Sequence, residues 1–168
     1  MNCRNQNQQK SAFFISLLNR RPEALARISG SGDYPEIHGC VRFYSTPHGT
    51  LVAVEVHGLP MALAPCKDPI FAFHLHDGNS CTGDCQDPFA GAMGHYNPED
   101  CPHPYHAGDL PPLFGNHGYA FSVFLTDRFC VREIIGKTII IHSAPDDFTS
   151  QPSGNSGEKI ACGVVQRF

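Results

Sequence analysis

The stretch PIFAFHLHDG, residues 69–78, alternates large apolar side chains with small residues and histidines before it ends at Asp-Gly. Successive side chains of a strand point to opposite faces, so this alternation predicts a strand. Its two faces would be Phe71, Phe73 and Leu75, and Ala72, His74 and His76. The first face suits a hydrophobic core, whereas the second presents two imidazoles. The stretch therefore raises the question of why so apolar a strand carries two histidines on one side.

The composition limits the classes of protein to which the chain can belong. A chain of 168 residues is long enough to bury a core and is expected to form one main domain. The net charge of −4 gives no basic footprint for nucleic acid, and no apolar run approaches the length of a membrane span. Ten histidines and eight cysteines are many for this length. Both residue types ligate metals, so a metal site is an early hypothesis.

Period-two alternation recurs along the chain and predicts an all-β sandwich or barrel. The expected strands are residues 24–30, 37–45, 50–60, 69–76, 119–127, 136–142 and 159–166. Two segments, 77–118 and 143–158, carry no strand pattern, and each follows a strand that ends in histidine. Loops this long inside a compact domain are usually functional, so the chemistry is expected there.

The first residues have a different composition. Residues 1–10 are polar and predicted to be disordered, and residues 11–19 fit a short docking helix or a frayed tail. We expect an N-terminal extension over 1–22 and the main domain over 23–168. The apolar stretch KSAFFISLL is followed by NRRPEA and by no A-x-A cleavage site. This favours a cytoplasmic chain, with an exported or cell-surface protein as the alternative.

Seven candidate metal ligands gather at strand ends and in the two long loops. They are His74, His76, His95, His103, His106, Asp109 and His142. A His-x-His pair alone is weak evidence, but His103, His106 and Asp109 stand three residues apart within one loop. One more ligand would complete a tetrahedral zinc site there. The remaining histidines are expected to be ordinary surface residues: His38, His48, His57 and His117.

Five segments, in their order, resemble the copper–zinc superoxide dismutase family. They are FAFHLHDGNSC, GHYNP, HAGDLP, IIIHSAPDD and GNSGEKIACGVV. The resemblance runs from Ala24 to Gln166 and is closest to the bacterial type, with a shortened metal loop between His103 and His106. It implies an eight-stranded Greek-key β-barrel, a sandwich of immunoglobulin-like type, with the metals outside the barrel under two long loops.

The resemblance also implies which residues form the site. The copper ligands would be His74, His76, His95 and His142, and the zinc ligands His95, His103, His106 and Asp109. His95 would bridge the two metals, and Asp146 would hydrogen-bond one ligand of each. Cys81 and Cys162 resemble the disulfide of the family, and Cys85 is a rival partner for Cys162. The remaining cysteines are expected to be free thiols, Cys3, Cys40, Cys66 and Cys130, while Cys101 lies close to the disulfide candidates.

The implied activity is that of an antioxidant oxidoreductase. It would disproportionate superoxide to oxygen and hydrogen peroxide at copper bridged to a structural zinc. His95 and Lys159 would be the catalytic residues, with Lys159 standing where the family has an arginine that attracts the anion. The alternative is a non-catalytic copper- and zinc-binding protein on the same fold. The expected partner is superoxide, with no nucleic acid and no membrane, and a homodimer remains open.

Overall fold

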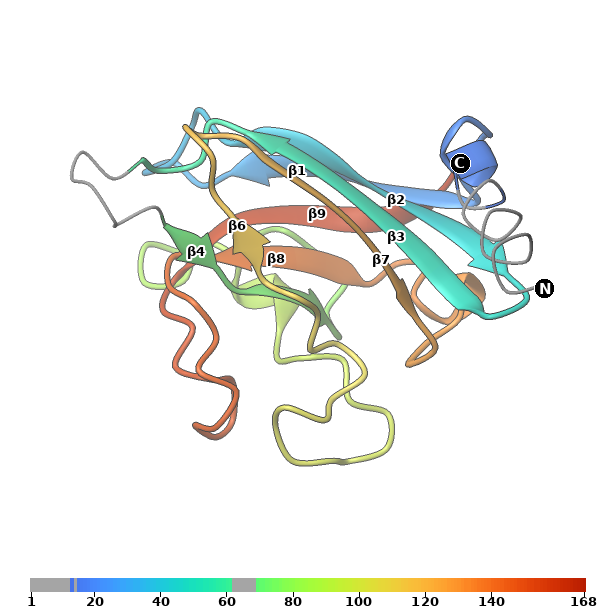
Figure 1. The fold of residues 1–168 in the computed structure, drawn as a ribbon. Coiled ribbons are helices and arrows are strands. Elements are labelled where there is room, and N and C mark those ends of the chain that lie inside the picture. Colours follow the sequence, from blue (N-terminus) through green and yellow to red (C-terminus); the bar gives the residue numbers. More distant parts are fainter. Residues whose placement is uncertain (1–12, 14, 62–68) are drawn as a thin grey trace, which may run out of the picture.

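The computed structural model describes residue 13, residues 15–61 and residues 69–168 (Figure 1). The elements are β1 (Ala24–Gly30), β2 (His38–Thr46), β3 (Gly49–His57), β4 (Ile70–Phe71), β5 (Phe73–His76), η1 (Ala90–Ala92), β6 (Leu113–Phe114), β7 (Ala120–Thr126), η2 (Val131–Glu133), β8 (Thr138–His142) and β9 (Lys159–Arg167). The segment predicted to be disordered, 1–10, and the predicted free thiols Cys3 and Cys66 lie outside the described residues.

The strands form one curled antiparallel sheet. Its order is β5-β8-β9-β1-β2-β3-β7, and a second, two-stranded sheet pairs β4 with β6. Strands β7 and β8 follow each other along the chain yet lie toward opposite ends of this order, as in a Greek key. If β4 and β5 are taken as one interrupted strand, the described chain has the eight strands of the expected Greek-key barrel. Figure 1 shows both long loops projecting from the same side of the sheet.

The core lies inside the curl and follows the alternation of the sequence. The main buried cluster takes every second residue of the long strands, among them Val41, Phe43, Val52, Val54, Val56, Ile139 and Ile141. In β7 the inward face carries Ala120 and Phe124, whereas Phe121, Val123 and Leu125 are exposed. Burying one face of each strand drives the curl, because the apolar face leaves water when the sheet closes on itself.

The strand predicted over 69–76 is two strands, β4 and β5. Ala72 separates them and belongs to neither strand pairing. Its N–H donates to Ala144 O at 2.8 Å, and its carbonyl accepts from His142 N at 2.9 Å. Before this point β4 pairs with β6, and after it β5 pairs with β8. The predicted core face is confirmed, because Phe71, Phe73 and Leu75 all belong to the main cluster. The segment 77–118 is not wholly without strands, since it contains β6, whose two residues are too few for a period-two pattern.

The described part of the extension packs on the outside of the sheet. Residues 15–18 are helical, and Leu17 is buried with Tyr44, Leu51 and Ala53 of β2 and β3. This agrees with a docking helix rather than a frayed tail. Among the described residues, no helix has the length and apolar character needed to cross a membrane.

Candidate metal centre

The short strand β5 builds the centre because it is an edge strand with two kinds of neighbour. One side pairs with β8, which ends at His142. On the other side the long loop attaches, since Leu75 N donates to Gly108 O at 2.9 Å and Tyr96 N donates to Leu75 O at 2.8 Å. Isolated bridges then place Asp109 beside His74 and His95 beside His76. Residues distant in the sequence meet at this one edge.

The first cluster consists of four histidines whose ring nitrogens lie within 4.8 Å of one another: His74, His76, His95 and His142. The Nε2 atoms of His76 and His142 are 3.3 Å apart. The Nδ1–H of His76 donates to Met93 O at 2.8 Å, and that of His142 points to Gly157 O at 3.4 Å. These carbonyls fix the tautomer, so the unprotonated Nε2 atoms face the cluster.

The second cluster consists of His95, His103, His106 and Asp109. The Asp109 carboxylate lies 2.7 Å from His95 Nδ1, 3.2 Å from His103 Nδ1 and 3.3 Å from His106 Nδ1. Three imidazoles and one carboxylate form a donor set that suits tetrahedral zinc. The cluster thus combines His95 with the three closely spaced loop residues singled out in the sequence, His103, His106 and Asp109.

His95 belongs to both clusters through different nitrogens. Its Nδ1 contacts Asp109 in the second cluster, whereas its Nε2 is buried without a partner. Two further buried imidazole nitrogens lack a hydrogen-bond partner. They are His74 Nδ1 in the first cluster and His103 Nδ1 in the second, whose 3.2 Å contact with Asp109 is not a hydrogen bond. Buried polar atoms are rarely left unsatisfied. A metal ion in each cluster would satisfy all three, so the residues present fit copper in the all-histidine cluster and zinc in the other.

Asp146 links the two clusters from behind. Its Oδ2 accepts from His74 Nε2 and its Oδ1 from His103 Nε2, both at 2.9 Å. Its Oδ1 also accepts from the backbone N–H of Phe148 at 2.7 Å, which holds the carboxylate in place. A single side chain thereby orients one imidazole of each cluster.

Burial sets the protonation of the centre. Desolvation, with the neighbouring His95, lowers the pKa of His74 to about 2, and desolvation lowers that of His142 to about 4. The pKa of His76 is also well below its usual value, mainly through burial. Burial alone would raise the pKa of Asp109, but hydrogen bonding and charge from His95 outweigh it and lower the pKa. Neutral imidazoles beside an ionised carboxylate are in the state that metal binding requires.

Lys159 begins β9 and lines a cleft of about 630 Å³ together with His76, His95 and His142. Its Nζ donates to Asp87 Oδ2 at 2.6 Å and to Phe89 O at 3.2 Å. Lys159 was predicted from the sequence as the residue that attracts the anion, but its partner Asp87 was not. Asp87 was missed because a single aspartate in a long loop carries no pattern.

Two other contributors to the centre were missed. Arg128 Nη1 donates to the carbonyls of His106 at 3.0 Å and Asp109 at 2.9 Å, and lies 3.4 Å from Pro104 O. The Gln151 side chain bonds both backbone groups of His103, accepting from its N–H at 3.0 Å and donating to its carbonyl at 2.7 Å. Both residues hold the backbone of the ligand loop, and a contact with backbone leaves no signal in the sequence.

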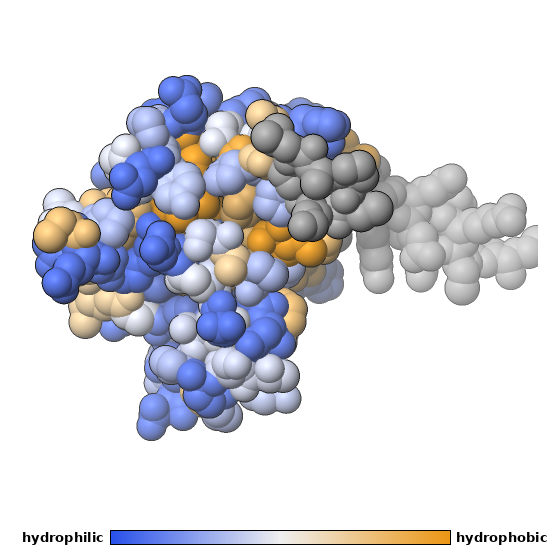
Figure 2. Space-filling view, turned by 90° about the vertical axis from the view of Figure 1, so that its left-hand side faces the viewer, coloured by the Kyte–Doolittle hydropathy of each residue, from blue (hydrophilic) through white to orange (hydrophobic). Residues whose placement is uncertain are grey.

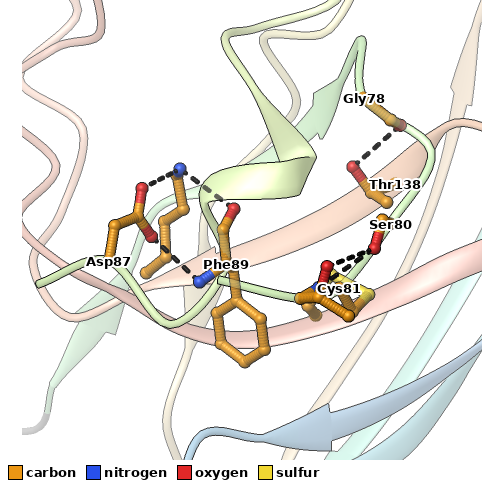
Figure 3. Close-up of a disulfide and its surroundings, with 9 residues drawn as sticks. Gly78, Ser80, Cys81, Asp87, Phe89 and Thr138 are labelled. Carbon is orange, nitrogen blue, oxygen red and sulfur yellow. Dashed lines mark hydrogen bonds and ion pairs between the residues drawn. A yellow bond between two sulfur atoms is a disulfide. The ribbon is translucent and has the colours of Figure 1, made fainter. Parts of the chain in front are cut away.

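A disulfide joins the long loop to the last strand between Cys81 and Cys162 (Figure 3). The rival partner, Cys85, is an exposed free thiol. Of the cysteines that the structure describes, Cys40, Cys101 and Cys130 are also free. The bond fixes the loop that follows β5 to the strand that carries Lys159. In Figure 2 the surface that projects below the sheet, where the long loops lie in Figure 1, is mainly hydrophilic.

Comparison with known proteins gives a consistent result. The family described as copper/zinc superoxide dismutase (SODC) matches residues 37–165. "Superoxide dismutase [Cu-Zn] 2" of Aquifex aeolicus is 33% identical over 147 residues, covering 78% of this chain and 80% of the relative. "Superoxide dismutase [Cu-Zn]" of Legionella pneumophila is 33% identical over 149 residues, covering 84% and 85%.

Solved structures agree with the sequence relatives. The Cu/Zn superoxide dismutase from Brucella abortus superposes with a TM-score of 0.70 at 25% identity and covers 84% of this chain and 99% of its own. A SOD-like protein from Bacillus subtilis superposes with a TM-score of 0.68 at 25% identity, covering 83% and 96%. The family match runs over residues 37–165, so it includes β2 to β8, all but the last two residues of β9, and all seven residues of the two clusters.

Proposed function

This chain belongs to the copper/zinc superoxide dismutase family, and we propose that its two histidine clusters are the copper and zinc sites of that enzyme. It is an oxidoreductase that disproportionates superoxide to oxygen and hydrogen peroxide, with copper and zinc as its cofactors. Copper would be held by His74, His76, His95 and His142, and zinc by His95, His103, His106 and Asp109. The observation that carries this assignment is the division of His95, whose two ring nitrogens face different clusters.

The side chains have distinct tasks in the proposed site. Copper, when bound, supplies the one-electron couple that dismutation needs and that zinc lacks. His95 Nε2 can hold or release a proton, because it faces the first cluster without a hydrogen-bond partner and its residue lines the cleft. Asp109 contacts the Nδ1 of the same ring and Asp146 orients a ring in each cluster. Lys159 provides the positive charge at the cleft that attracts the anionic substrate.

The runner-up function is a non-catalytic copper- and zinc-binding protein on the same fold. The likeness to a protein titled only "SOD-like" shows that superposition alone does not separate the two. The complete all-histidine cluster favours the enzyme, because three of its four histidines, His76, His95 and His142, line an open cleft. A storage or transfer protein needs no access for a second small molecule.

Metal analysis combined with a superoxide-consumption assay tests the proposal. The reconstituted protein should hold about one copper and one zinc per chain. His142→Gln should lose copper and activity while keeping zinc, because His142 belongs to the first cluster only. His48→Gln is the matched control, since His48 is exposed and outside both clusters. Wild-type protein that holds both metals and does not consume superoxide would identify the non-catalytic alternative.

A homodimer is part of the proposal. The exposed row on β7 consists of Phe121, Val123 and Leu125, exposed by 59%, 37% and 42%. It continues the buried apolar surface of β3, where Leu51 pairs with Leu125 and Ala53 with Val123. Such a row is a natural contact for a second copy. Sedimentation equilibrium of wild type and Val123→Glu tests this, with a monomeric variant expected and a monomeric wild type as the contrary result.

The compartment is also a proposal. We propose the cytoplasm, with export as the alternative. The Cys81–Cys162 disulfide supports the alternative, since such bonds persist in oxidising compartments. Cell fractionation followed by detection of the protein decides between them.

A further inference from the structure

Two links join the same loop to the same strand beside the cleft. The Cys81–Cys162 disulfide is one, and the Asp87–Lys159 ion pair is the other (Figure 3). The loop also turns back on itself near Asp87, because Asp87 Oδ1 accepts from Phe89 N at 3.0 Å and Asp84 Oδ1 accepts from Asp87 N at 3.0 Å. The carboxylate is therefore held by its own loop before it meets the lysine.

The pairing uses most of the hydrogen-bonding capacity of Lys159. A lysine ammonium has three N–H donors. One bonds Asp87 Oδ2 and a second bonds Phe89 O, so a single donor is left for a ligand. The lysine side chain is only 16% exposed, against 40% for that of Asp87. The ammonium is thus fixed at the cleft wall and is not a freely moving charge.

The charges along the cleft add to this restriction. Lys159 is the single lysine or arginine among the described residues that line it, whereas three carboxylate residues line it: Asp33, Asp87 and Glu158. Superoxide is an anion, so a cleft of this balance gives little net attraction. The one cation there is already paired with one of the three carboxylates.

We propose that Asp87 is a positioning and specificity-determining residue that fixes Lys159 as a single hydrogen-bond donor and offsets its charge toward small anions. This rests on the proposed function, in which an anion enters the cleft. Asp87 acts through Lys159 and needs no contact with the substrate. Relieving the offset should strengthen the binding of any small anion at the first cluster.

Chemical labelling tests the ion pair without any metal. A lysine held in an ion pair is acylated slowly, and peptide mass spectrometry can follow each amine. Lys137, paired with Asp77 at 2.6 Å, is the internal reference. Asp87→Asn should raise the labelling rate of Lys159 relative to Lys137 about two- to fivefold, the range of a partly exposed pair. Asp87→Glu should restore slow labelling, and Glu158→Gln, which removes a carboxylate from the same cleft, should leave it unchanged.

Azide titration of the copper-loaded protein tests the effect on anions. Asp87→Asn should tighten azide binding about two- to fivefold at low salt, and the gain should shrink at high salt because screening weakens exposed charges. In a Lys159→Met background, Asp87→Asn should tighten azide binding no more than Glu158→Gln does. The proposal would be overturned if Asp87→Asn tightened azide binding equally with and without Lys159, or if it left the labelling rate of Lys159 unchanged. Faster labelling in a protein that binds no copper would reject the proposed function and the anion role, while leaving the ion pair in place.

Discussion

Four histidines of the two clusters, His74, His76, His103 and His142, use one ring nitrogen for a protein partner outside the clusters and leave the other for the cluster. His74 and His103 give Nε2 to Asp146, whereas His76 gives Nδ1 to the carbonyl of Met93. These partners select the tautomer and the angle of the ring. Asp146 and the Met93 carbonyl, which belong to neither cluster, therefore orient the ring nitrogens that face the clusters.

Asp146→Asn should loosen copper and zinc together, because one carboxylate orients a ring in each cluster. Loss of such a partner commonly weakens metal affinity ~10–100-fold. A competition between the protein and a chelator measures both metals. Asp147→Asn is the matched control, since the Asp147 side chain bonds only within its turn, to Thr149 and Ser150. Equal retention by the two variants would make Asp146 an ordinary loop residue.

The metal-free protein, prepared by chelation, should lose stability as the pH falls from neutral toward 4. Burial lowers the pKa of His142 from 6.5 to about 4, so between these values the unfolded chain binds the proton and the folded protein does not. The free energy of unfolding therefore falls as the pH falls, by roughly 3 kcal/mol for this residue over the whole window. Urea unfolding at pH 7, 6 and 5 measures the slope.

His142→Gln provides the control for that slope. The variant lacks the titrating ring, so its free energy of unfolding should depend less steeply on pH than that of the wild type. A wild type equally stable at pH 7 and pH 5 would show that these imidazoles gain protons in the folded state as easily as in the unfolded chain.

The residues of the two clusters could be predicted because their positions in the sequence carry information. Histidine at the end of an apolar strand is unusual, and the spacing of His103, His106 and Asp109 suggests one metal. Arg128, Gln151 and Asp87 could not be predicted. Arg128 and Gln151 act on backbone groups of the ligand loop, and Asp87 acts on a lysine 72 residues away. Any polar residue in a turn looks the same in a sequence.

At the scale of elements, the divided strand explains how the centre is assembled. Ala72 fits the alternation of its neighbours, so the sequence shows one strand over 69–76. The break comes from its hydrogen bonds to Ala144 and His142, which are distant in sequence and invisible to a local pattern. It frees β5 to pair with β8 on one side and to accept the long loop on the other. On its other side β5 thus has cluster residues, Asp109 beside His74 and His95 beside His76, in place of a second neighbouring strand.

Arg128 connects this loop to the end of β7, and Arg128→Ala should speed the loss of zinc. Its Nη1 donates to the carbonyls of His106 and Asp109, two of the four residues of the second cluster. We expect zinc release to a coloured chelator to rise about tenfold, as for other partners that orient ligands, with copper retention changed less. Arg132→Ala is the control, since Arg132 is exposed on η2 nearby. Identical zinc release by the two variants would remove Arg128 from the site.

At the scale of the whole molecule, the sheet is a frame and the loops carry the chemistry. The architecture could be predicted from alternation because burial of one face dominates the folding energy of each strand. Alternation could not predict which face of β7 points inward, because one face carries Phe121 and the other carries Phe124. Only the closed sheet shows that Phe124 packs on the core and Phe121 remains exposed. The overall charge of −4 likewise says little about the cleft, where local pairing decides.

The boundary between the extension 1–22 and the domain 23–168 gives the last prediction. Deleting residues 1–22 should preserve both metals and dismutase activity, because every cluster residue lies after β3. The free energy of unfolding should fall by about 2 kcal/mol, the value of burying one leucine, since Leu17 covers Tyr44, Leu51 and Ala53.

Leu17→Ala in the full chain should reproduce most of that loss, whereas Ile15→Ala should not, because Ile15 is 62% exposed. Urea unfolding and metal analysis of the three variants measure both effects. A truncated chain that no longer holds copper and zinc would show that the extension is part of the domain. A Leu17→Ala protein as stable as the wild type would show that the packing of this helix adds nothing to the stability of the sheet.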